Sequence, residues 1–177
     1  MYEIERKYHI KNKAALLQRI SQVIGVKKLR EIDQTDAIFL PQDKKTFEEL
    51  SKGDPVVRLR RENDTTQITL KKSMENSSNI ELETNIEDYD TTEQILLNLS
   101  LNQVTLVKKR RTEYSYKDYT LTIDSVEGLG DFLEIEYVSN YNDPSIEKKI
   151  KAIANELGLE ENEYEPLKYD ALLAAAK

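Results

Sequence analysis

The sequence contains no cysteine and no tryptophan, and it has only five glycines, four prolines and one histidine. Without cysteine the chain can have no disulfide, no thiolate nucleophile and no cysteine-based zinc site. The glycines are scattered and form no phosphate-binding loop, and we find no Ser-His-Asp arrangement. The single histidine, His9, shares the predicted strand face of Lys7, but a lone histidine is more often structural than catalytic.

No apolar run approaches the length of a membrane-spanning helix, and the charged segment that begins at Glu3 does not resemble a secretory signal. With 177 residues, the chain is long enough for one good core, so we expect a single domain over residues 1–177. One third of the residues are charged and the net charge is -7. This composition favours a cytoplasmic enzyme or binding protein with no membrane partner, and it leaves a homodimer open.

A basic run, Lys108-Lys109-Arg110-Arg111, could be interpreted as a nucleic-acid patch. In a strand, however, only alternate members of the run share a face, and the negative net charge opposes broad binding to a phosphate backbone. We therefore expect no nucleic-acid partner.

Charged residues recur at every second position in seven segments of the chain. Because alternate side chains of a β-strand point to the same face, each segment predicts one charged face and one apolar face. The segments are Glu3-x-Glu5-x-Lys7, Arg58-x-Arg60, Thr69-x-Lys71, Glu81-x-Glu83, Lys109-x-Arg111, the strand ending at Asp124, and Glu134-x-Glu136.

Two architectures are compatible with this pattern. In an open antiparallel sheet, the charged faces would simply meet solvent. In a closed barrel, they would line a polar interior, while Ile4, Leu59, Leu70, Ile123 and Ile135 would face outward beneath helices. Acid pairs and base pairs are cleanly separated along the chain, whereas a solvating surface usually mixes them loosely. A charged interior is costly unless each group finds a partner, a metal or water, so a barrel implies a functional cavity.

Hydrophobic periodicity and turn residues predict eight strands, a number suited to a barrel, and four helices. The expected strands are 2–9, 29–40, 56–62, 66–73, 79–86, 104–115, 118–126 and 131–139. The expected helices are 12–24, 93–100 capped by Thr91 or Thr92, 144–157 and 166–176. The predicted fold is thus α+β: an eight-stranded antiparallel closed β-barrel, or tunnel, with a charged interior and flanking helices.

The ordered set of charged motifs resembles the CYTH family, the triphosphate tunnel metalloenzymes, over almost the whole chain. Gln34-Thr35-Asp36 followed by Phe39, the stretch 129–136, and Tyr169-x-x-Leu172-Leu173 are most similar to the class IV adenylyl cyclase branch. The resemblance implies a metal site built from acids of the first strand and the last two strands. It carries over to Glu3, Glu5, Asp124, Glu134 and Glu136.

The chemistry of the side chains agrees with this resemblance. Guanidinium and ammonium groups bind phosphoryl oxygens, and hard divalent cations such as Mg²⁺ or Mn²⁺ take oxygen ligands. The predicted triphosphate-binding residues are Lys7, Arg58, Arg60, Lys71, Lys109 and Arg111, of which Lys71, Lys109 and Arg111 are also the predicted catalytic residues. Glu81 and Glu83 have two open interpretations: metal ligands, or acids that orient the bases through ion pairs.

Three functions remain open. The first is a class IV type adenylate cyclase, a phosphorus–oxygen lyase in which the ribose 3′-hydroxyl of ATP attacks the α-phosphorus and pyrophosphate leaves. The second is a hydrolase of inorganic tripolyphosphate or of an organic triphosphate such as thiamine triphosphate. The third is a non-catalytic binder of triphosphates or nucleotides, which an intact set of metal-ligand positions disfavours.

Overall fold

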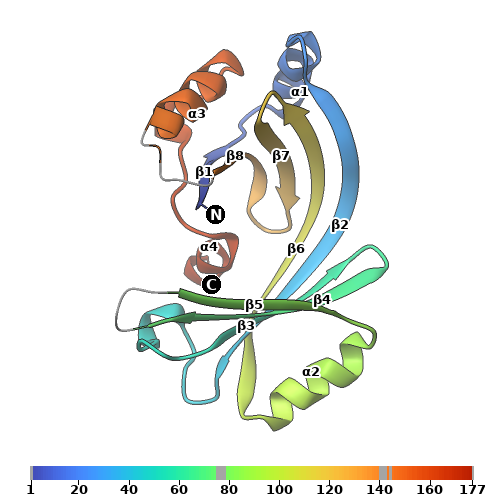
Figure 1. Cartoon of the computed structure of the whole chain (residues 1–177), viewed down its shortest axis with the longest axis vertical. Coiled ribbons are helices and arrows are strands. Elements are labelled where there is room, and N and C mark those ends of the chain that lie inside the picture. Colours follow the sequence, from blue (N-terminus) through green and yellow to red (C-terminus); the bar gives the residue numbers. More distant parts are fainter. Residues whose placement is uncertain (1, 75–78, 140–142, 144, 177) are drawn as a thin grey trace. The chain divides into compact units, whose positions relative to one another are not determined.

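The computed structural model describes residues 2–74, 79–139, 143 and 145–176, except for the side chains of Tyr2, Glu3 and Asn79 (Figure 1). Its strands are β1 (Tyr2–His9), β2 (Lys27–Pro41), β3 (Val56–Glu62), β4 (Thr65–Ser73), β5 (Asn79–Ile86), β6 (Leu101–Tyr116), β7 (Tyr119–Val126) and β8 (Gly130–Ser139). Its helices are α1 (Lys13–Gln22), α2 (Tyr89–Asn98), α3 (Ser145–Glu156) and α4 (Tyr169–Ala175). No helix among the described residues is long and apolar enough to cross a membrane.

The eight strands form one sheet with the order β1-β8-β7-β6-β2-β3-β4-β5. The pairs whose register is known are all antiparallel. The prediction of an α+β fold with eight antiparallel strands and flanking helices is therefore confirmed. Strands β1 and β5 end the order, so backbone hydrogen bonds within the described residues do not close the predicted barrel.

The chain divides into two compact units. Unit 1 comprises Met1–Ile32 and Lys109–Leu167, and unit 2 comprises Asp33–Lys108 and Lys168–Lys177. The two longest strands, β2 and β6, each contribute residues to both units. Each unit contains its own apolar cluster and its own set of charged residues, and each is treated separately below.

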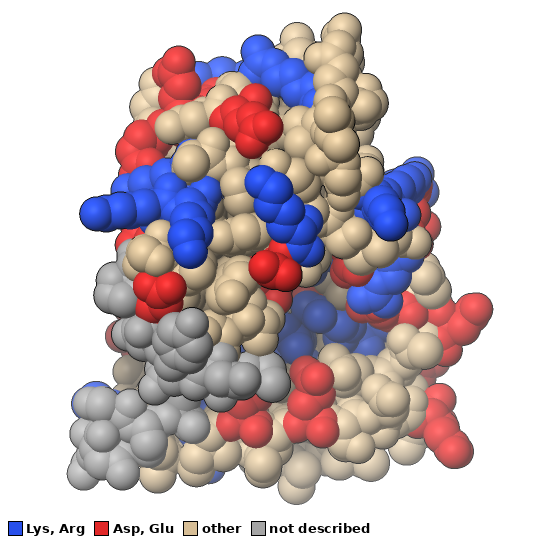
Figure 2. Space-filling view, turned by 45° about the horizontal axis from the view of Figure 1, so that its top comes forward, with Lys and Arg blue, Asp and Glu red and all other residues tan. Residues whose placement is uncertain are grey.

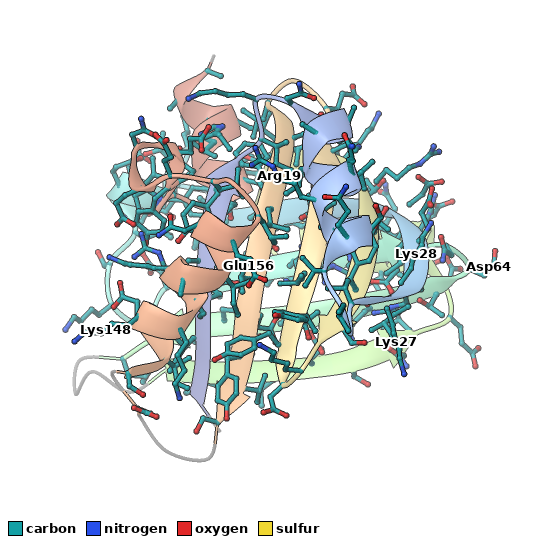
Figure 3. The ribbon with its side chains drawn as sticks, turned by 90° about the horizontal axis from the view of Figure 1, so that it is seen from above. Arg19, Lys27, Lys28, Asp64, Lys148 and Glu156 are labelled. Carbon is teal, nitrogen blue, oxygen red and sulfur yellow. The ribbon has the colours of Figure 1, made fainter. Side chains whose placement is uncertain are left out.

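In unit 1, the apolar face of the strands packs against α1 and α3. Figure 3 shows α1, which carries Arg19, and α3, which carries Glu156, lying over the strands of this unit. The buried cluster contains Ile123 and Ile135 from the strands, and Ile4 packs against it. The helices contribute Leu16, Ile20, Ile146, Ile150 and Ile153.

A smaller cluster forms the core of unit 2. Phe39 and Leu59 from the strands pack with Leu96 of α2, and Leu70 is partly buried against them. The predicted apolar faces of Leu59, Leu70, Ile123 and Ile135 thus pack in clusters that include helix residues, as expected from the alternation. The opposite faces of the same strands are left for the charged residues.

A buried arginine fastens α3 to β1. Arg6 is only 5% exposed, and its guanidinium donates to Glu147 of α3 at 2.7 Å and to the Tyr8 hydroxyl at 2.9 Å. A third hydrogen bond of 2.7 Å reaches Glu161, in the short 3₁₀ turn Glu161–Glu163 that follows α3. These hydrogen bonds offset the free-energy cost of burying the guanidinium. Arg6 can therefore serve a structural role on the apolar side of β1.

The structure corrects one predicted cap. We expected Thr91 or Thr92 to cap a helix that begins near residue 93, but α2 begins at Tyr89 and its N-cap is Asp88. The Asp88 carboxylate accepts hydrogen bonds from the Thr91 backbone N–H at 2.9 Å and from the Thr91 hydroxyl at 2.7 Å. An ionised carboxylate is a strong acceptor at a helix N-terminus, which also lowers the pKa of Asp88 below its ordinary value.

The unit 1 core makes a direct prediction about stability. Ile150 of α3 is 0% exposed, so Ile150→Ala removes buried methyl groups and leaves a cavity, at an expected cost of about 2–5 kcal/mol. The control is Ile24→Ala, because Ile24 is 94% exposed and its truncation leaves no cavity. Urea unfolding followed by circular dichroism measures both variants. Equal unfolding midpoints for the two would contradict this account of the core.

Candidate active site

The charged face of unit 1 is built by the register of β1, β8, β7 and β6. Lys7 of β1 lies opposite Glu134 of β8, and Glu5 lies opposite Glu136. Arg111 of β6 lies opposite Asp124 of β7. Because side chains alternate along each strand, these residues share the face that points away from α1 and α3. Unit 1 therefore gathers three of its predicted bases and four of its predicted acids on one polar face.

Asp124 is the centre of this face. Its side chain is 0% exposed, and Lys109 Nζ donates to its Oδ2 at 2.9 Å. Arg111 binds it bidentately, with Nε 2.7 Å from Oδ1 and Nη2 2.6 Å from Oδ2. The same Nη2 lies 2.6 Å from Glu134 Oε2. Two bases and two acids thus form one contiguous network in which the buried carboxylate has charged donors on both oxygens.

The pKa values of Asp124 and Lys109 are both lowered, although burial acts on the two groups in opposite directions. Burial tends to raise the pKa of Asp124, but the hydrogen bonds and charges of Arg111 and Lys109 outweigh it and hold the pKa below its ordinary value. Burial, aided by the neighbouring Arg111, lowers the pKa of Lys109. The carboxylate is therefore strongly committed to its charged form.

The acids at the other end of the face suit a hard cation. Glu5 and Glu136 lie directly opposite each other on adjacent strands, where two like charges repel unless a cation or a base lies near them. The backbone of Glu3 continues β1, but its side chain lies outside the described residues. Among the described side chains, no three or more Asp, Glu and His residues gather in an arrangement that could hold a metal ion. The donor chemistry of Glu5 and Glu136 fits Mg²⁺ or Mn²⁺, whereas Asp124 is occupied by two bases.

In unit 2, each predicted base has an acid beside it. Arg58 Nη2 donates to the Thr69 hydroxyl at 3.0 Å and lies 3.1 Å from Glu83 Oε2, and the Thr69 hydroxyl donates to the same Glu83 oxygen at 2.8 Å. Lys71 Nζ lies 2.9 Å from Glu81 Oε1. Burial, followed by the charge of Arg60, lowers the pKa of Arg58. In this structure Glu81 and Glu83 form ion pairs with bases, and both interpretations given above stay predictions.

Three residues of the polar faces were not among the predicted site residues, although Asp36 and Thr69 belong to motifs named above. Asp36 lies opposite Arg60 and binds its guanidinium bidentately, with both distances 2.7 Å. Thr69 is fully buried between Arg58 and Glu83. On unit 1, Glu113 binds Arg30 at 2.6 and 3.1 Å. The sequence signal was the alternation itself, since Glu113 continues Lys109-x-Arg111, but the partners follow only from strand register.

His9 lies near Lys7 but makes structural contacts. Its Nε2 is 3.0 Å from Glu165 Oε2, and its ring centroid is 4.5 Å from that of Phe132.

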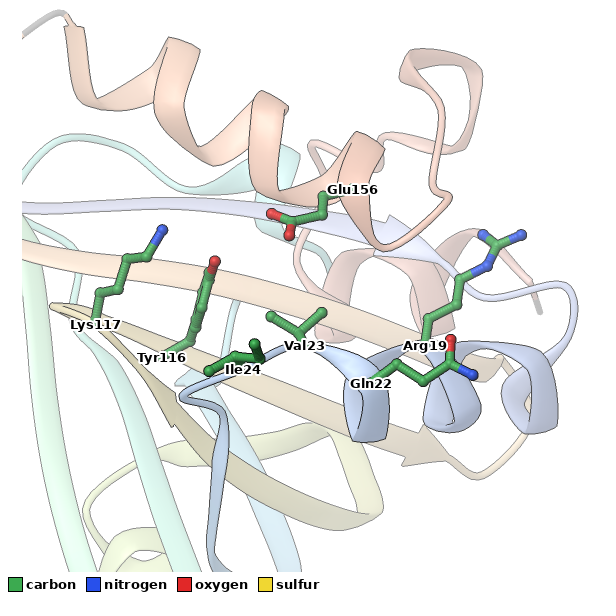
Figure 4. A pocket seen from close by; sticks show the side chains of 7 residues that line it. All are labelled: Arg19, Gln22, Val23, Ile24, Tyr116, Lys117 and Glu156. Carbon is green, nitrogen blue, oxygen red and sulfur yellow. The ribbon is translucent and has the colours of Figure 1, made fainter.

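A separate cleft of about 500 Å³ opens on unit 1 (Figure 4). It is lined by Arg19, Gln22, Val23 and Ile24 near the end of α1, by Tyr116 and Lys117 at the β6–β7 turn, and by Glu156 at the end of α3. No predicted site residue contributes to it.

The molecular surface in Figure 2 shows basic and acidic side chains interspersed on the face in view, rather than one continuous basic stripe.

Comparison with known proteins gives a consistent result. The model of the CYTH domain family matches residues 1–169 of the chain. A protein of Methanocaldococcus jannaschii named "Putative adenylate cyclase" is 30% identical over 139 residues, which cover 77% of each protein. Adenylate cyclase CyaB of Aeromonas hydrophila is 31% identical over 90 residues, which cover 50% of this chain and 47% of that protein.

Solved structures share the fold over nearly the full length. A protein of Pyrococcus horikoshii OT3 superposes with a TM-score of 0.78 and 29% identity, covering 97% of this chain and 99% of that one. A second structure, from Hippeastrum, superposes with a TM-score of 0.69 and 17% identity, covering 99% and 97% of the two chains. Its description is a "Putative adenylyl cyclase" that "reveals a dominant triphophatase activity". At this identity the second likeness concerns the fold alone.

The Asp124 network predicts a specific response to acid. Because its pKa is depressed in the folded state, Asp124 stays charged where the unfolded chain, with a pKa of about 3.9, binds a proton. Its contribution to stability is therefore complete at neutral pH and is lost as the pH falls through about 4 and below. Asp124→Asn leaves buried bases undercompensated and is expected to cost about 3–5 kcal/mol at neutral pH.

Urea unfolding as a function of pH tests this expectation. The free energy of unfolding of Asp124→Asn should depend less steeply on acid pH than that of the wild type. Asp118→Asn, a substitution at an exposed position of the β6–β7 turn, is the control and should follow the wild type. Parallel pH curves for the wild type and Asp124→Asn would refute the assignment.

Proposed function

The chain belongs to the CYTH domain family, and from this membership we propose that it is a divalent-metal-dependent enzyme acting on triphosphates, specifically an adenylate cyclase that converts ATP to cyclic AMP and pyrophosphate. The observation that carries the proposal is the polar face of unit 1, where Lys109, Arg111 and Lys7 lie beside a set of carboxylates. A triphosphate with its metal needs both kinds of group. The names of the two curated relatives support the choice of cyclisation.

The bases of this face are suited to bind phosphoryl oxygens. Arg111 offers a planar fork of donors that already engages two carboxylates, and phosphate oxygens present a similar target. Lys109 and Lys7 are ammonium point charges, each less than 10% exposed. In the proposal these groups neutralise the charge that builds on the departing pyrophosphate, which is the main demand of nucleotidyl transfer. Arg58, Arg60 and Lys71 of unit 2 remain predicted triphosphate-binding residues.

The carboxylates of unit 1 provide the metal chemistry in this proposal. Glu5 and Glu136, together with Glu3 and Glu134, would hold Mg²⁺ or Mn²⁺ once their side chains converge on the ion, since no three of the described acids gather in this structure. Such an ion, when bound, neutralises phosphate charge and lowers the pKa of the attacking hydroxyl. Asp124 accepts three hydrogen bonds from Lys109 and Arg111 in this structure, so in the proposal these bases turn toward the phosphates when Asp124 joins the ligand set.

Hydrolysis of a triphosphate is the second candidate. The same groups would then position water for attack on the terminal phosphorus, with orthophosphate as the product. The observation that favours it is the triphosphatase activity named for the Hippeastrum protein, which shares this fold. The two reactions differ in nucleophile and product but make the same demand on the charged residues.

Metal dependence is the first test. Glu136→Gln is expected to abolish turnover and to preserve the fold, because it removes a predicted ligand while relieving the like-charge pair with Glu5. Glu134→Gln also removes a predicted ligand but breaks the ion pair with Arg111, so Glu136 is the cleaner position. Glu127→Gln, at an exposed position of the β7–β8 turn, is the control. Full turnover in EDTA, or in the folded Glu136→Gln variant, would exclude the metal assignment.

Product analysis decides between the two reactions. With ATP and Mn²⁺ the cyclase produces cyclic AMP and pyrophosphate, whereas the hydrolase produces orthophosphate, and faster from tripolyphosphate than from ATP. Chromatography of the nucleotides and a phosphate assay measure both. Orthophosphate without cyclic nucleotide would exclude the cyclase and support the hydrolase. Absence of product from every triphosphate would exclude both activities.

The same assay tests the bases. Arg60→Ala and Lys109→Ala are each expected to lower kcat/KM by an amount equivalent to about 3 kcal/mol, the scale of one lost charge-stabilising contact. Arg61→Ala is the matched control for Arg60, because Arg61 is the next residue of β3 and its half-exposed side chain contacts the exposed Asp90. Comparable losses in Arg60→Ala and Arg61→Ala would show that the effect is not specific to the polar face.

A further inference from the structure

A short segment of unit 1 runs along the outer edge of β1. This segment, residues 164–167, follows the 3₁₀ turn Glu161–Glu163, and we call it the strap. Tyr164 forms an antiparallel bridge with Tyr8, and the Glu165 backbone N–H donates to the Lys7 carbonyl oxygen at 2.8 Å. The strap therefore continues the sheet beyond β1 for a few residues, beside a predicted triphosphate-binding lysine.

The strap also contacts the Lys7 side chain. The Lys7 ammonium donates to the carbonyl oxygen of Leu167. An ammonium has three donors, and this contact orients the group through one of them. The lysine is thus held at both ends, by a strap N–H on its backbone and by a strap carbonyl on its ammonium.

The Glu165 carboxylate links the strap backbone to the end of β1. Glu165 Oε1 accepts from the Leu167 backbone N–H at 2.8 Å, which turns the chain so that the Leu167 carbonyl can reach Lys7. Glu165 Oε2 lies 3.0 Å from His9 Nε2, which ties the same side chain to the end of β1. Although burial acts to raise it, these two hydrogen bonds hold the pKa of Glu165 below its ordinary value.

Contacts at the first residue of the strap and in the turn before it hold the strap in place. The Arg6 guanidinium lies 3.6 Å from the centroid of the Tyr164 ring, and Lys11 Nζ lies 3.1 Å from Glu163 Oε1. The Glu163 carboxylate also accepts from the Glu160 backbone N–H at 2.8 Å. The strap is therefore an ordered element whose geometry is available before any ligand binds.

We infer that Glu165 is a positioning residue for Lys7: through the strap, it places the Lys7 ammonium where it binds the phosphates of the substrate. The inference rests on the proposed function, because it requires Lys7 to contact a triphosphate. Lysine has a long, flexible side chain, and holding it in one geometry before binding removes a cost that binding would otherwise incur. Glu165 needs no contact with the substrate to do so.

A double-mutant cycle on binding tests the inference without requiring turnover. Isothermal titration calorimetry measures the affinity of the full chain for inorganic tripolyphosphate with Mg²⁺. Glu165→Ala is expected to weaken binding about tenfold in the wild-type background, and to have no further effect in the Lys7→Ala background. Glu165→Gln, whose amide oxygen can still accept from Leu167 N–H, is expected to weaken binding only two- to threefold.

The control is Glu127→Ala, an exposed glutamate of the same unit, which should leave affinity unchanged in both backgrounds. Circular dichroism establishes whether each variant is folded. If Glu165→Ala is unfolded, the same cycle is run with Glu165→Gln. That variant is expected to lose two- to threefold in affinity, and only in the wild-type background. Wild-type affinity in the folded Glu165 variant, or an equal loss in both backgrounds, overturns the positioning role and leaves the proposed function standing. Failure of the wild-type chain to bind tripolyphosphate overturns both.

Discussion

The buried carboxylate of Asp124 is the constraint on which the polar face of unit 1 depends. A charge that is 0% exposed is tolerable only with charged donors on both oxygens, and Lys109 and Arg111 supply them at 2.6–2.9 Å. Because these bases come from β6 and the acid from β7, the ion pairs require the observed register between the two strands. Arg111 then extends the network to Glu134 on β8, so one connected set of charges spans three strands.

The two units compensate their charges differently. In unit 2, Arg58, Arg60 and Lys71 each lie against one acid, namely Glu83, Asp36 and Glu81. In unit 1, two bases share Asp124, while Glu5 and Glu136 are placed opposite each other. A one-to-one match orients bases for an anion, whereas opposed carboxylates favour a cation. Metal ligation by the acids of unit 1 stays a proposal, and Glu81 and Glu83 contact bases in this structure.

Rigid surroundings hold these charged faces in position. The apolar sides of the strands are buried under α1 and α3 in unit 1 and against α2 in unit 2, so the strand backbones that carry the charged side chains are anchored from behind. Arg6, on the apolar side of β1, fastens both α3 and the turn before the strap. Neighbouring side chains of β1 therefore point to opposite faces of the sheet: Arg6 contacts the helix layer, and Lys7 faces the candidate site.

The strand period of two explains how much the sequence could determine by itself. Together with turn residues, it was sufficient to predict the strands, to separate Leu59, Ile123 and Ile135 from the charged faces, and to select the charged motifs by which the chain resembles the CYTH family. Those properties are local, because they depend only on which side chains alternate along one strand. The cap of α2 is also a local feature, but the prediction named Thr91 or Thr92, whereas the structure places Asp88 there.

Which acid meets which base was decided by the tertiary structure, because it depends on register between strands far apart in the chain. Asp36 and Arg60 are 24 residues apart, and Lys7 and Leu167 are 160 apart, so no pattern within one strand can pair them. The alternation could state that a charged face exists, but only the folded chain shows that Asp124 belongs to two bases and that the strap reaches Lys7. The alternation of side chains along a strand can be read from the sequence. Which side chains pair across strands depends on the packing that brings the strands together.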